Sequence, residues 1–507
     1  MKINLIIPAA GQATRLRPLS NNQSKAMVRV NGKPCIDFIL EKCLEKHELE
    51  EVVIIDGTLN DIREYVSRRW NHINISFVKQ KVLIGPRNAI QIGAHILKDL
   101  SIPSVVWLGD SIILEDNLPL GEDFLLTKIV SDHNNWCMWD QIENKFYDKP
   151  THTIPMASAL VGMYSFSDSV RMLSALDSTV DEYDISAILI KYGSKFNNIS
   201  TEKWYDIGQV SSYYKTCASL LSLKCRAFNS ITYDSELNLI NKQPDYHNTN
   251  AIETIESEKS WYRGLDWKQQ LFVPRFIDNG NGLTLSYEPG LLLSDLLMYE
   301  DMPASTWEYI IDKIFHIIRT YFHNQPWPTP QLSESIYSFS ENCQMIWIDK
   351  TIDRLKSTKF SKEIVEQITN YAHEIYRKSI PVACMHGDLH FGNILYNAQN
   401  DKLAFIDPRG KYGSINGNVG DNTYDWAKLA QELVFGYNHL VSNIPYTNRD
   451  KIIDIFKRMC KKYDVDYDLV VKGGLVLLAT CIPLHSDNTM RQKRFKEKVD
   501  EYFNNCI

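Results

Sequence analysis

The sequence has few of the features that mark specialised classes of protein. Its ten cysteines form no C-x-x-C pair and no tight cluster, which argues against a disulfide framework or a zinc site and indicates reduced thiols. The formal net charge is −7, whereas proteins that bind a nucleic-acid phosphate backbone carry an excess of basic residues, so we expect no nucleic-acid partner. The apolar run from Gly473 to Leu484 is too short to span a bilayer and predicts a core helix. We therefore expect a cytoplasmic protein without membrane insertion.

The chain also lacks internal repeats, low-complexity tracts and a Gly/Ser-rich linker. Its N-terminal apolar stretch is short and is interrupted by Asn4, so we expect a buried first strand there in place of a signal peptide. With 507 residues, 44% of them hydrophobic and 23% charged, the sequence has ordinary globular composition and is too long for one core. A length prior predicts roughly three folding units.

Short β-rich segments alternate with helical patterns in residues 1–218. The expected strands cover 3–7, 52–56, 75–78 and 105–108, and the expected helices cover 36–46, 60–69 and 89–100. Alternation at this spacing predicts a parallel sheet with right-handed crossovers, that is, an α/β Rossmann-like domain. Ligands of such sheets bind at the carboxyl ends of the strands, so residues just after each strand are candidates for a site.

The pattern changes in residues 219–507. A strand-rich lobe is expected over 219–300, with strands at 228–233, 237–242, 273–277 and 283–288 and a helix at 253–265. From 301 to 507 the chain is mostly helical, with one β-like interruption around 394–407. A strand-rich lobe that leads into a helical lobe predicts a two-lobed α+β domain.

The first expected strand leads into a loop of small residues. Ala10 and Gly11 allow backbone N–H groups to approach a phosphate closely, and Arg15 supplies a fixed cation. Lys25 offers a point charge to a second phosphate. The same loop composition is equally typical of an ordinary tight turn between a strand and a helix.

Two carboxylates follow β-rich segments. Asp110 ends the string V-V-W-L-G-D, and Asp206 lies within W-Y-D-I-G. If they converged on one Mg²⁺, they would suit attack by a phosphate oxygen on a nucleotide α-phosphorus, because the metal offsets charge and fixes geometry. Taken singly, each Asp is also typical of a cap or a turn.

Residues 1–215 resemble the sugar-phosphate nucleotidyltransferase family. The loop matches its G-x-G-T-R-L-x-P signature, which implies nucleotide binding by Ala10 and Gly11 and catalytic roles for Arg15 and Lys25. Asp148-Lys149-Pro150 resembles the family's E-K-P element, and residues 161–166 resemble the strand that follows it. The remaining matches imply base recognition by Gln80, Gly85 and Ala89, binding of the substrate phosphate by Lys25 and Lys149, and metal binding by Asp110 and Asp206.

Several positions depart from this family pattern. Ala13 stands where the second loop glycine is expected, and it fits that position provided that its φ is negative. Ser24 replaces the proline before Lys25, Asp148 replaces a glutamate, and Pro86-Arg87 is unusual in the base-recognition segment. These departures leave the chemistry intact and leave the identity of the base and of the acceptor open.

A second motif lies in H-G-D-L-H-F-G-N-I-L, which is followed by A-F-I-D-P. The D-x-x-x-x-N spacing, then a hairpin and another Asp, is the catalytic arrangement of protein kinases. It assigns the acceptor hydroxyl proton to Asp388 and Mg²⁺ binding to Asn393 and Asp407. His386 and Asp425 are expected to be structural, with Asp425 tying the catalytic loop.

The partners of a nucleotide site lie upstream of this motif. Lys242 is expected to reach the α- and β-phosphates and to pair with Glu258, although Glu253 and Glu256 compete for that role and all three are also typical of a solvated helix face. Glu288, next to Tyr287, is expected in a hinge that binds adenine.

Residues 225–507 resemble the aminoglycoside phosphotransferase/choline kinase family of protein-kinase-like enzymes, through H-G-D-x-H-x-G-N and the following I-D. The resemblance implies phosphorylation of a small hydroxyl compound. Arg409, in D-P-R-G, departs from the usual I-D-[FW] continuation and places a cation beside the metal site. It would contact a phosphate or an anionic acceptor, or form an ion pair with a nearby carboxylate.

Together the two resemblances predict a bifunctional enzyme that uses ATP, a second NTP and Mg²⁺. The kinase half would make a phosphate, and the first half would couple it to an NMP unit with release of pyrophosphate. The Lys149 element favours a sugar acceptor, and hence a nucleotide-activated sugar for surface polysaccharide or glycoconjugate synthesis.

Two alternatives remain open, together with the possibility of a homo-oligomer. One is a choline or amino-alcohol kinase joined to a cytidylyltransferase, whose aromatic cage could use Trp261, Tyr262, Tyr424 and Trp426. The other is a nucleotidyltransferase regulated by a catalytically silent kinase-like module.

Overall fold

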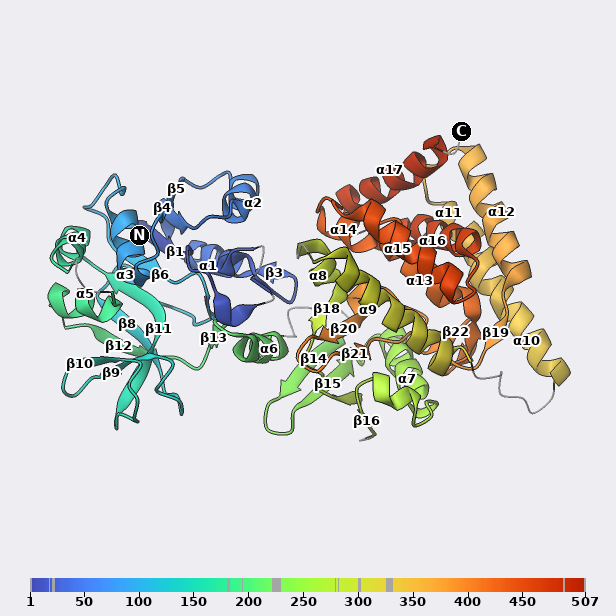
Figure 1. Ribbon diagram of the computed structural model, residues 1–507, viewed down its shortest axis with the longest axis horizontal. Helices are drawn as coiled ribbons and strands as arrows, with labels where there is room; N and C mark the ends of the chain where they lie inside the picture. Colours follow the sequence, from blue (N-terminus) through green and yellow to red (C-terminus); the bar gives the residue numbers. More distant parts are fainter. Residues whose placement is uncertain are drawn as a thin grey trace. The chain divides into compact units, whose positions relative to one another are not determined.

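A computed structural model describes residues 2–17, 19–20, 23–179, 183–193, 195–220, 229–278, 280, 282–299, 302–324, 332–486 and 488–505. The chain divides into two compact units, Met1–Leu220 and Leu221–Ile507, each with its own sheets and helices (Figure 1). Each unit is described by itself. Phe228, at the start of an expected strand, lies outside the described residues.

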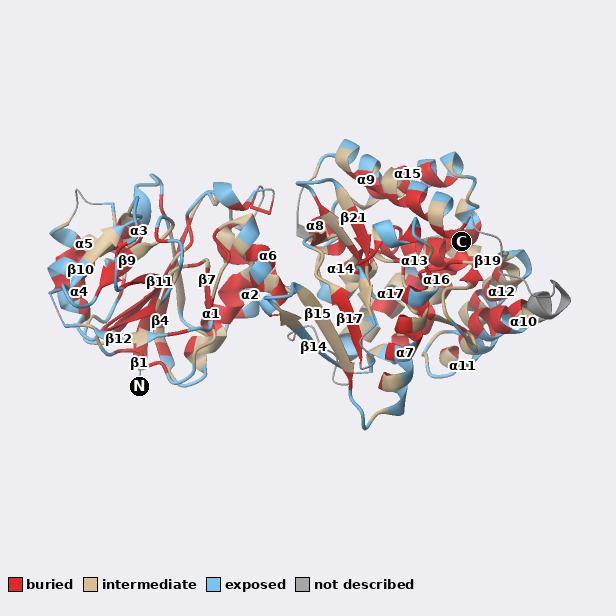
Figure 2. Ribbon diagram, turned by 90° about the horizontal axis from the view of Figure 1, so that it is seen from below, coloured by how far each residue is buried: buried red, intermediate tan, exposed pale blue. Residues whose placement is uncertain are grey.

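The first unit is built on a large sheet with the path β10-β9-β11-β6-β1-β4-β5. Its parallel part consists of β1 (Lys2–Pro8), β4 (Glu48–Asp56), β5 (Ile75–Lys79) and β6 (Ser104–Trp107). The helices of this part are α1 (Cys35–Leu44), α2 (Asp61–Arg69) and α3 (Gly85–Ala94). These seven elements overlap the seven expected from the sequence, and the inner strands are buried (Figure 2).

The expected parallel strands are confirmed as the β6-β1-β4-β5 part of this sheet, and antiparallel strands that were not predicted extend it beyond β6. β11 (Ala157–Phe166) is antiparallel to β6, β8 (Phe124–Lys128) and β9 (Cys137–Asp140). The remaining strands of this sheet are β10 (Lys145–Asp148) and β12 (Asn197–Ser200). Every residue of β11 is buried, so it lacks the alternation that distinguishes an antiparallel strand in a sequence.

Smaller elements complete the first unit. They are β2 (Arg29–Val30), β3 (Lys33–Pro34), β7 (Ser111–Ile113), β13 (Trp204–Asp206), α4 (Ser169–Asp177), α5 (Ile185–Tyr192) and α6 (Val210–Ser219). β13 pairs with β7 so that Asp206 lies opposite Ser111. This pairing brings the chain after β6 next to a segment nearly a hundred positions later.

The second unit begins with an antiparallel sheet in the order β14-β15-β17-β16. Its strands are β14 (Asn229–Asp234), β15 (Leu239–Pro244), β16 (Phe276–Ile277) and β17 (Leu283–Ser286), and α7 (Thr249–Arg263) lies between β15 and β16 in the chain. A second sheet joins β18 (Leu291–Leu292) to the hairpin of β20 (Ile394–Asn397) and β21 (Lys402–Phe405).

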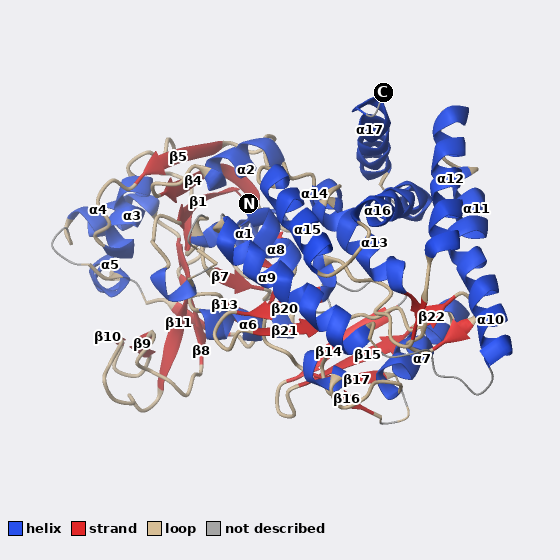
Figure 3. Cartoon of the chain, turned by 45° about the vertical axis from the view of Figure 1, so that its right-hand side comes forward, coloured by secondary structure: helices blue, strands red, loops and turns tan. Residues whose placement is uncertain are grey.

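The rest of the second unit is mainly helical (Figure 3). Its helices are α8 (Leu293–Tyr299), α9 (Ala304–Ile317), α10 (Leu332–Gln344), α11 (Lys350–Leu355), α12 (Lys362–Lys378), α13 (Asn422–Leu433), α14 (Tyr437–Ser442), α15 (Arg449–Lys462), α16 (Tyr467–Cys481) and α17 (Thr489–Asn505). Short strands β19 (Pro381–Val382), β22 (Lys411–Tyr412), β23 (Ile415–Asn416) and β24 (Gly420–Asp421) lie between them.

In the described part of the chain one helical segment, Tyr467–His485, is long and apolar enough to cross a membrane by length and composition. Most of α16 is packed inside the unit, including Leu475 and Leu478, which have no exposed surface. This burial is that of a core helix, as the sequence predicted.

Candidate active sites

The two carboxylates expected at the first site lie close together. Lys25 Nζ forms an ion pair with Asp110 Oδ2, and the Ile207 amide donates to the Asp110 carbonyl over 3.2 Å. Ser212 Oγ donates to Asp206 Oδ2 over 2.6 Å. Burial, followed by the charge of Asp110, raises the pKa of Asp206. Two neighbouring carboxylates, one of them carrying a raised pKa, form a site that favours a bound cation.

The chemistry of this donor set fits Mg²⁺, which prefers carboxylate oxygens together with substrate phosphates. Among the described residues no cluster of three or more His, Cys, Asp or Glu side chains could hold a metal by itself. A metal at Asp110 and Asp206 would therefore take its remaining ligands from substrate oxygens and water.

The loop after β1 departs from expectation at Ala13. Its φ is +47° and its ψ is +40°, so the condition of a negative φ is not met. A left-handed conformation costs an alanine about 1–2 kcal/mol, and this cost explains why a glycine suits the position. Gly11 and Arg15 are exposed, and Arg15 makes no hydrogen bond or ion pair with any described residue, so its guanidinium is available to a ligand.

Ser24 has a role that proline could not fill. Its backbone N–H donates to Asp61 Oδ2 over 2.6 Å, and its hydroxyl donates to Asp61 Oδ1 over 2.5 Å. These two bonds tie the segment before Lys25 to the first turn of α2. The serine that replaces the family's proline therefore has a specific partner, Asp61.

The expected base-recognition residues lie together at the start of α3. Gln80 Nε2 donates to the Gly85 carbonyl over 3.3 Å and to Asn88 Oδ1 over 3.0 Å. Gly85 has a φ of +87°, and a Cβ there would lie 2.8 Å from the Tyr183 carbonyl oxygen. Ala89 is buried in the same helix.

Arg87, the unusual residue of that segment, is 1% exposed and bonds the Leu176 carbonyl at the end of α4. Its guanidinium therefore joins two helices of the first unit. The departure from the family pattern at Arg87 is therefore explained by packing between these two helices.

Lys149 lies just after β10, and its side chain makes no hydrogen bond or ion pair with the described residues. Its amide donates to the Trp136 carbonyl over 3.0 Å. The Trp136 ring packs edge-on against Trp204, with ring centroids 4.7 Å apart, and Trp204 begins the strand that carries Asp206. Lys149 is thereby linked to the strand that carries Asp206, and no hydrogen bond or ion pair joins it to Lys25.

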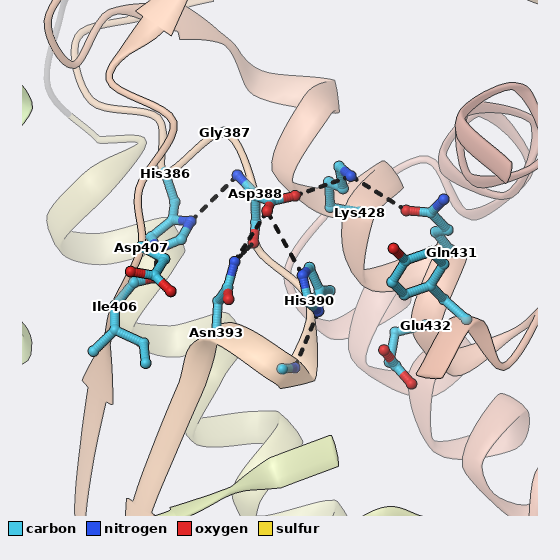
Figure 4. Close-up of polar contacts among 12 residues, drawn as sticks. His386, Gly387, Asp388, His390, Asn393, Ile406, Asp407, Lys428, Gln431 and Glu432 are labelled. Carbon is cyan, nitrogen blue, oxygen red and sulfur yellow. Dashed lines mark hydrogen bonds and ion pairs between the residues drawn. The ribbon is translucent and has the colours of Figure 1, made fainter. Parts of the chain in front are cut away.

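The second site is centred on Asp388 (Figure 4). Asn393 Nδ2 donates to Asp388 Oδ2 over 3.1 Å, and Lys428 Nζ lies 3.0 Å from Asp388 Oδ1. His390 Nε2 lies 3.6 Å from Oδ2. Desolvation opposes ionisation, but the charges of Lys428 and His390 outweigh it and hold the pKa of Asp388 well below its usual range. These charges favour the ionised form of the carboxylate.

Asp407 lies at the same end of the β20–β21 hairpin as Asn393. The Ile406 amide donates to the Asn393 carbonyl over 3.0 Å, and Ile394 pairs with Phe405. Asp407 has a φ of +53°, an uncommon conformation for a residue other than glycine, and its side chain is 55% exposed. Strained backbone of this kind is concentrated at functional sites.

Lys242 is held by two carboxylates. Its Nζ lies 2.7 and 2.9 Å from the oxygens of Glu258 and 3.4 Å from Asp407 Oδ1. Burial opposes the charge of Lys242, but Asp407 and Glu258 outweigh it and raise its pKa. Glu256 pairs with Lys259 over 2.9 Å, so Glu258 is the glutamate that pairs with Lys242.

Two expected structural residues support the loop of Asp388. Asp425 is fully buried and accepts hydrogen bonds from the amides of His386 and Gly387 over 2.9 and 2.8 Å. The Nε2 of His323 lies 3.1 Å from Asp425 and, against the opposing effect of burial, lowers the pKa of that carboxyl. His386 is also fully buried, which lowers its pKa, and it bonds the Ile406 carbonyl over 3.0 Å.

Glu288 lies between β17 and β18, in the connection that joins the β14-β15-β17-β16 sheet to the β18-β20-β21 sheet. Its carboxylate pairs with Lys402 Nζ over 2.6 Å. The side chain is therefore engaged within the protein, and a role in binding adenine would fall to backbone groups of this segment.

The four aromatic residues considered for a cage in the second unit are interior. Trp261, Tyr262, Tyr424 and Trp426 are each 4% exposed or less. Trp426 packs against Phe315 with centroids 4.6 Å apart, and the Trp261 indole donates to the Met385 carbonyl over 2.7 Å. These rings build the core of the unit.

Lys428 was missed in the sequence because its partner Asp388 is distant along the chain. A signal was present, since Lys428 follows Asp425 by one helical turn and therefore shares a face of α13 with it. Asp61, which bonds Ser24, was missed for the same reason, and Ser212, which bonds Asp206, was missed although it lies only six positions after it.

Comparisons with known proteins bear on the first unit. Residues 4–127 match the family model described as nucleotidyl transferase. The UTP–glucose-1-phosphate uridylyltransferase of Haloferax volcanii is 25% identical over 227 residues, which cover 40% of this chain and 90% of that protein. The choline-phosphate cytidylyltransferase of Streptococcus pneumoniae is 42% identical over 65 residues, which cover 13% of this chain and 28% of that protein. A solved UDP-glucose pyrophosphorylase complexed with UDP-glucose aligns at 20% identity over 43% of this chain and 97% of its own, with a TM-score of 0.37.

Proposed function

Because the first unit contains a nucleotidyltransferase domain, we propose that the chain is a bifunctional enzyme. Its second unit phosphorylates a small hydroxyl compound with ATP, and its first unit couples that phosphate to an NMP unit from a second NTP. The observation that carries the proposal is the set of contacts around Asp388, Asn393, Asp407 and the Lys242–Glu258 pair.

In the second unit, the acceptor hydroxyl oxygen attacks the γ-phosphorus of ATP. A new P–O bond forms while the bond from that phosphorus to the β–γ bridging oxygen breaks, and ADP leaves. Asp388 accepts the hydroxyl proton, which is consistent with its ionised state. Lys242 binds the α- and β-phosphates, and Asn393 and Asp407 are the residues that would hold Mg²⁺.

In the first unit, a phosphate oxygen of the acceptor attacks the α-phosphorus of the NTP. The bond from that phosphorus to the α–β bridging oxygen breaks, and pyrophosphate leaves. Arg15 and Lys25 bind phosphate oxygens, and Asp110 and Asp206 would hold Mg²⁺. When bound at either site, Mg²⁺ offsets the negative charge on the reacting phosphates.

We further propose that the product is a nucleotide-activated sugar for surface polysaccharide or glycoconjugate synthesis. Support comes from the free ammonium of Lys149 after β10 and from the glucose-1-phosphate that names one relative. With a sugar phosphate as acceptor, Lys149 binds the phosphate of the sugar, while Gln80, Gly85 and Ala89 contact the base.

A choline-type alcohol is the second candidate. The 65-residue similarity to a choline-phosphate cytidylyltransferase and the Trp136–Trp204 pair in the segment of Asp206 favour it, because aromatic faces attract quaternary amines. A silent second unit is disfavoured, because keeping Lys242 and Glu258 buried together is costly when no ligand uses them.

Two single variants of the full chain test the proposal. Asp388→Ala should abolish ATP-dependent phosphorylation and leave transfer of NMP to a supplied sugar 1-phosphate intact, and Asp110→Ala should do the reverse. Asp468→Ala, at an exposed aspartate of α16, serves as the matched control and should change neither reaction. Loss of both reactions in either folded variant would contradict the division into two sites.

A further inference from the structure

Four cationic side chains from three segments gather beside Asp388. Lys350 and Arg354 belong to α11, Arg409 follows β21, and Lys428 belongs to α13. All four are half-buried. Lys428 Nζ lies 3.0 Å from Asp388 Oδ1, and the Arg409 amide donates to the His386 carbonyl, in the loop of Asp388, over 2.9 Å. Lys350 is close enough to the other three cations and to Asp388 for their charges to act on it.

These cations have few partners within the protein. Arg409 donates to the Tyr424 hydroxyl over 2.8 Å, and Arg354 donates to the Thr480 carbonyl over 3.5 Å. The Lys350 ammonium makes no hydrogen bond or ion pair with a described residue. Of the four, Lys428 alone has a carboxylate within ion-pair distance in the described part of the chain, and that carboxylate is Asp388. The ion pair considered for Arg409 in the sequence is therefore not formed there.

Gathering four cations around one carboxylate is unfavourable unless an anion joins them. Burial, followed by the charges of Arg409, Arg354 and Lys428, lowers the pKa of Lys350 to about 6, so the charged form of Lys350 at neutral pH requires an anion that joins the cluster. Lys350 also follows directly on a π-helical turn, Met345–Asp349, and turns of this kind occur frequently at functional sites. The cluster thus has the properties of a binding site for a negatively charged group.

Within the cluster, Arg409 follows Asp407 by two positions, whereas Lys428 and Asn393 contact different oxygens of Asp388. Oδ1 of Asp388 is bound by Lys428, whereas Oδ2 is bound by Asn393 (Figure 4). Glu432, the other carboxylate near Lys428, is fully buried and bonds Asn438, and burial raises its pKa to about 7. Its contribution of negative charge is correspondingly small.

Resting on the kinase function proposed above, we propose that the acceptor of the second unit is an anionic hydroxyl compound. Its carboxylate or phosphate group binds Lys350, Arg354 and Arg409, while its hydroxyl lies at Asp388. The same cations repel a quaternary amine, so this site selects against a choline-like alcohol.

The test is phosphorylation of matched acceptors by the full chain with ATP and Mg²⁺, followed as ADP release. The probes are glycerol, glycerate and glycerol 3-phosphate, then glucose, glucuronate and glucose 6-phosphate, with choline as the cationic probe. We expect kcat/KM at least tenfold higher for an anionic probe than for its neutral counterpart, and the ratio of carboxylate to phosphate probes identifies the anion. A preference for neutral probes or choline overturns the anionic acceptor and leaves the kinase function standing. If no probe is phosphorylated, both fail.

Variants of the four cationic residues distinguish binding of the acceptor from binding of ATP. Lys350→Met and Arg409→Met should lower kcat/KM for anionic probes at least tenfold through the acceptor KM, with the KM for ATP within twofold of the parent. Lys350→Met should not lower the melting temperature, because it removes a cation from a crowded cluster, and Lys356→Met, at an exposed lysine of the same region, should change nothing. A raised KM for ATP with every acceptor would mean that the cluster binds the γ-phosphate, and would overturn the inference.

Discussion

The buried pair of Lys242 and Glu258 allows a quantitative prediction. The side chains are 14% and 3% exposed, and two contacts of 2.7 and 2.9 Å join them. Glu258→Gln keeps the shape of the side chain and removes its charge. Removing the charge of one partner of a buried ion pair typically lowers the free energy of unfolding by about 3–5 kcal/mol. Because Asp407 still lies 3.4 Å from the ammonium, we expect a smaller loss of about 2–3 kcal/mol.

The same substitution should disable the second site. With Glu258 neutral, Lys242 is left with Asp407 as its charged partner, and it then competes for the carboxylate proposed to hold Mg²⁺. We expect the kcat/KM for ATP to fall by about a hundredfold or more, which corresponds to about 3 kcal/mol of transition-state stabilisation. Nucleotidyl transfer by the first unit should not change.

Thermal unfolding of the full chain measures the loss of stability. For a unit of this size, about 2–3 kcal/mol lowers the midpoint of its transition by roughly 3–5 °C. Lys242→Met combined with Glu258→Met should recover at least half of that loss and none of the kinase activity, because an apolar pair needs no charge partner. Glu256→Gln is the control, since its carboxylate pairs with Lys259 while 54% exposed and should contribute less than about 1 kcal/mol. If Glu258→Gln unfolds like this control, or the double variant is no more stable than the single one, the reasoning is refuted.

Further predictions concern the first unit. Ala13→Gly relieves a left-handed alanine and should raise the free energy of unfolding by about 0.5–1 kcal/mol after the greater flexibility of glycine is counted, and a lower melting temperature would contradict this. Ser24→Pro removes the N–H bond to Asp61 and should lower stability by about 1–3 kcal/mol, more than Ser24→Ala, and an equal effect of the two would contradict it. The raised pKa of Asp206 means that this carboxyl takes up a proton at a higher pH than usual, so the apparent Mg²⁺ affinity should weaken as the pH falls from 7 towards 5. Titration of Mg²⁺ at several pH values checks this, and an affinity independent of pH would contradict it.

Features set by local sequence were predictable. The strands and helices of the parallel region and the spacing of Asp388, Asn393 and Asp407 follow from periodicity and from the geometry of a hairpin. The pairing of Lys242 with Glu258 also followed, although only the structure distinguishes Glu258 from Glu253 and Glu256.

Features set by tertiary contacts were not predictable. The left-handed conformation of Ala13 and the burial of Arg87 depend on packing that a local pattern does not contain. Lys350 and Lys428 approach Asp388 from separate helices, so their spacing in the sequence carries no sign of the cluster. The antiparallel placement of β11 was missed because a fully buried strand shows no alternation.

The central claim, that one chain first phosphorylates an acceptor and then joins that phosphate to a nucleotide, can be tested by following a single phosphorus atom. The full chain is incubated with ATP labelled at the γ-phosphate, unlabelled UTP or CTP, Mg²⁺ and the acceptor that supports ADP release. The account predicts label in the acceptor phosphate and then in the nucleotide conjugate, with unlabelled pyrophosphate. Label confined to inorganic phosphate or pyrophosphate, with a conjugate that carries none, would contradict it.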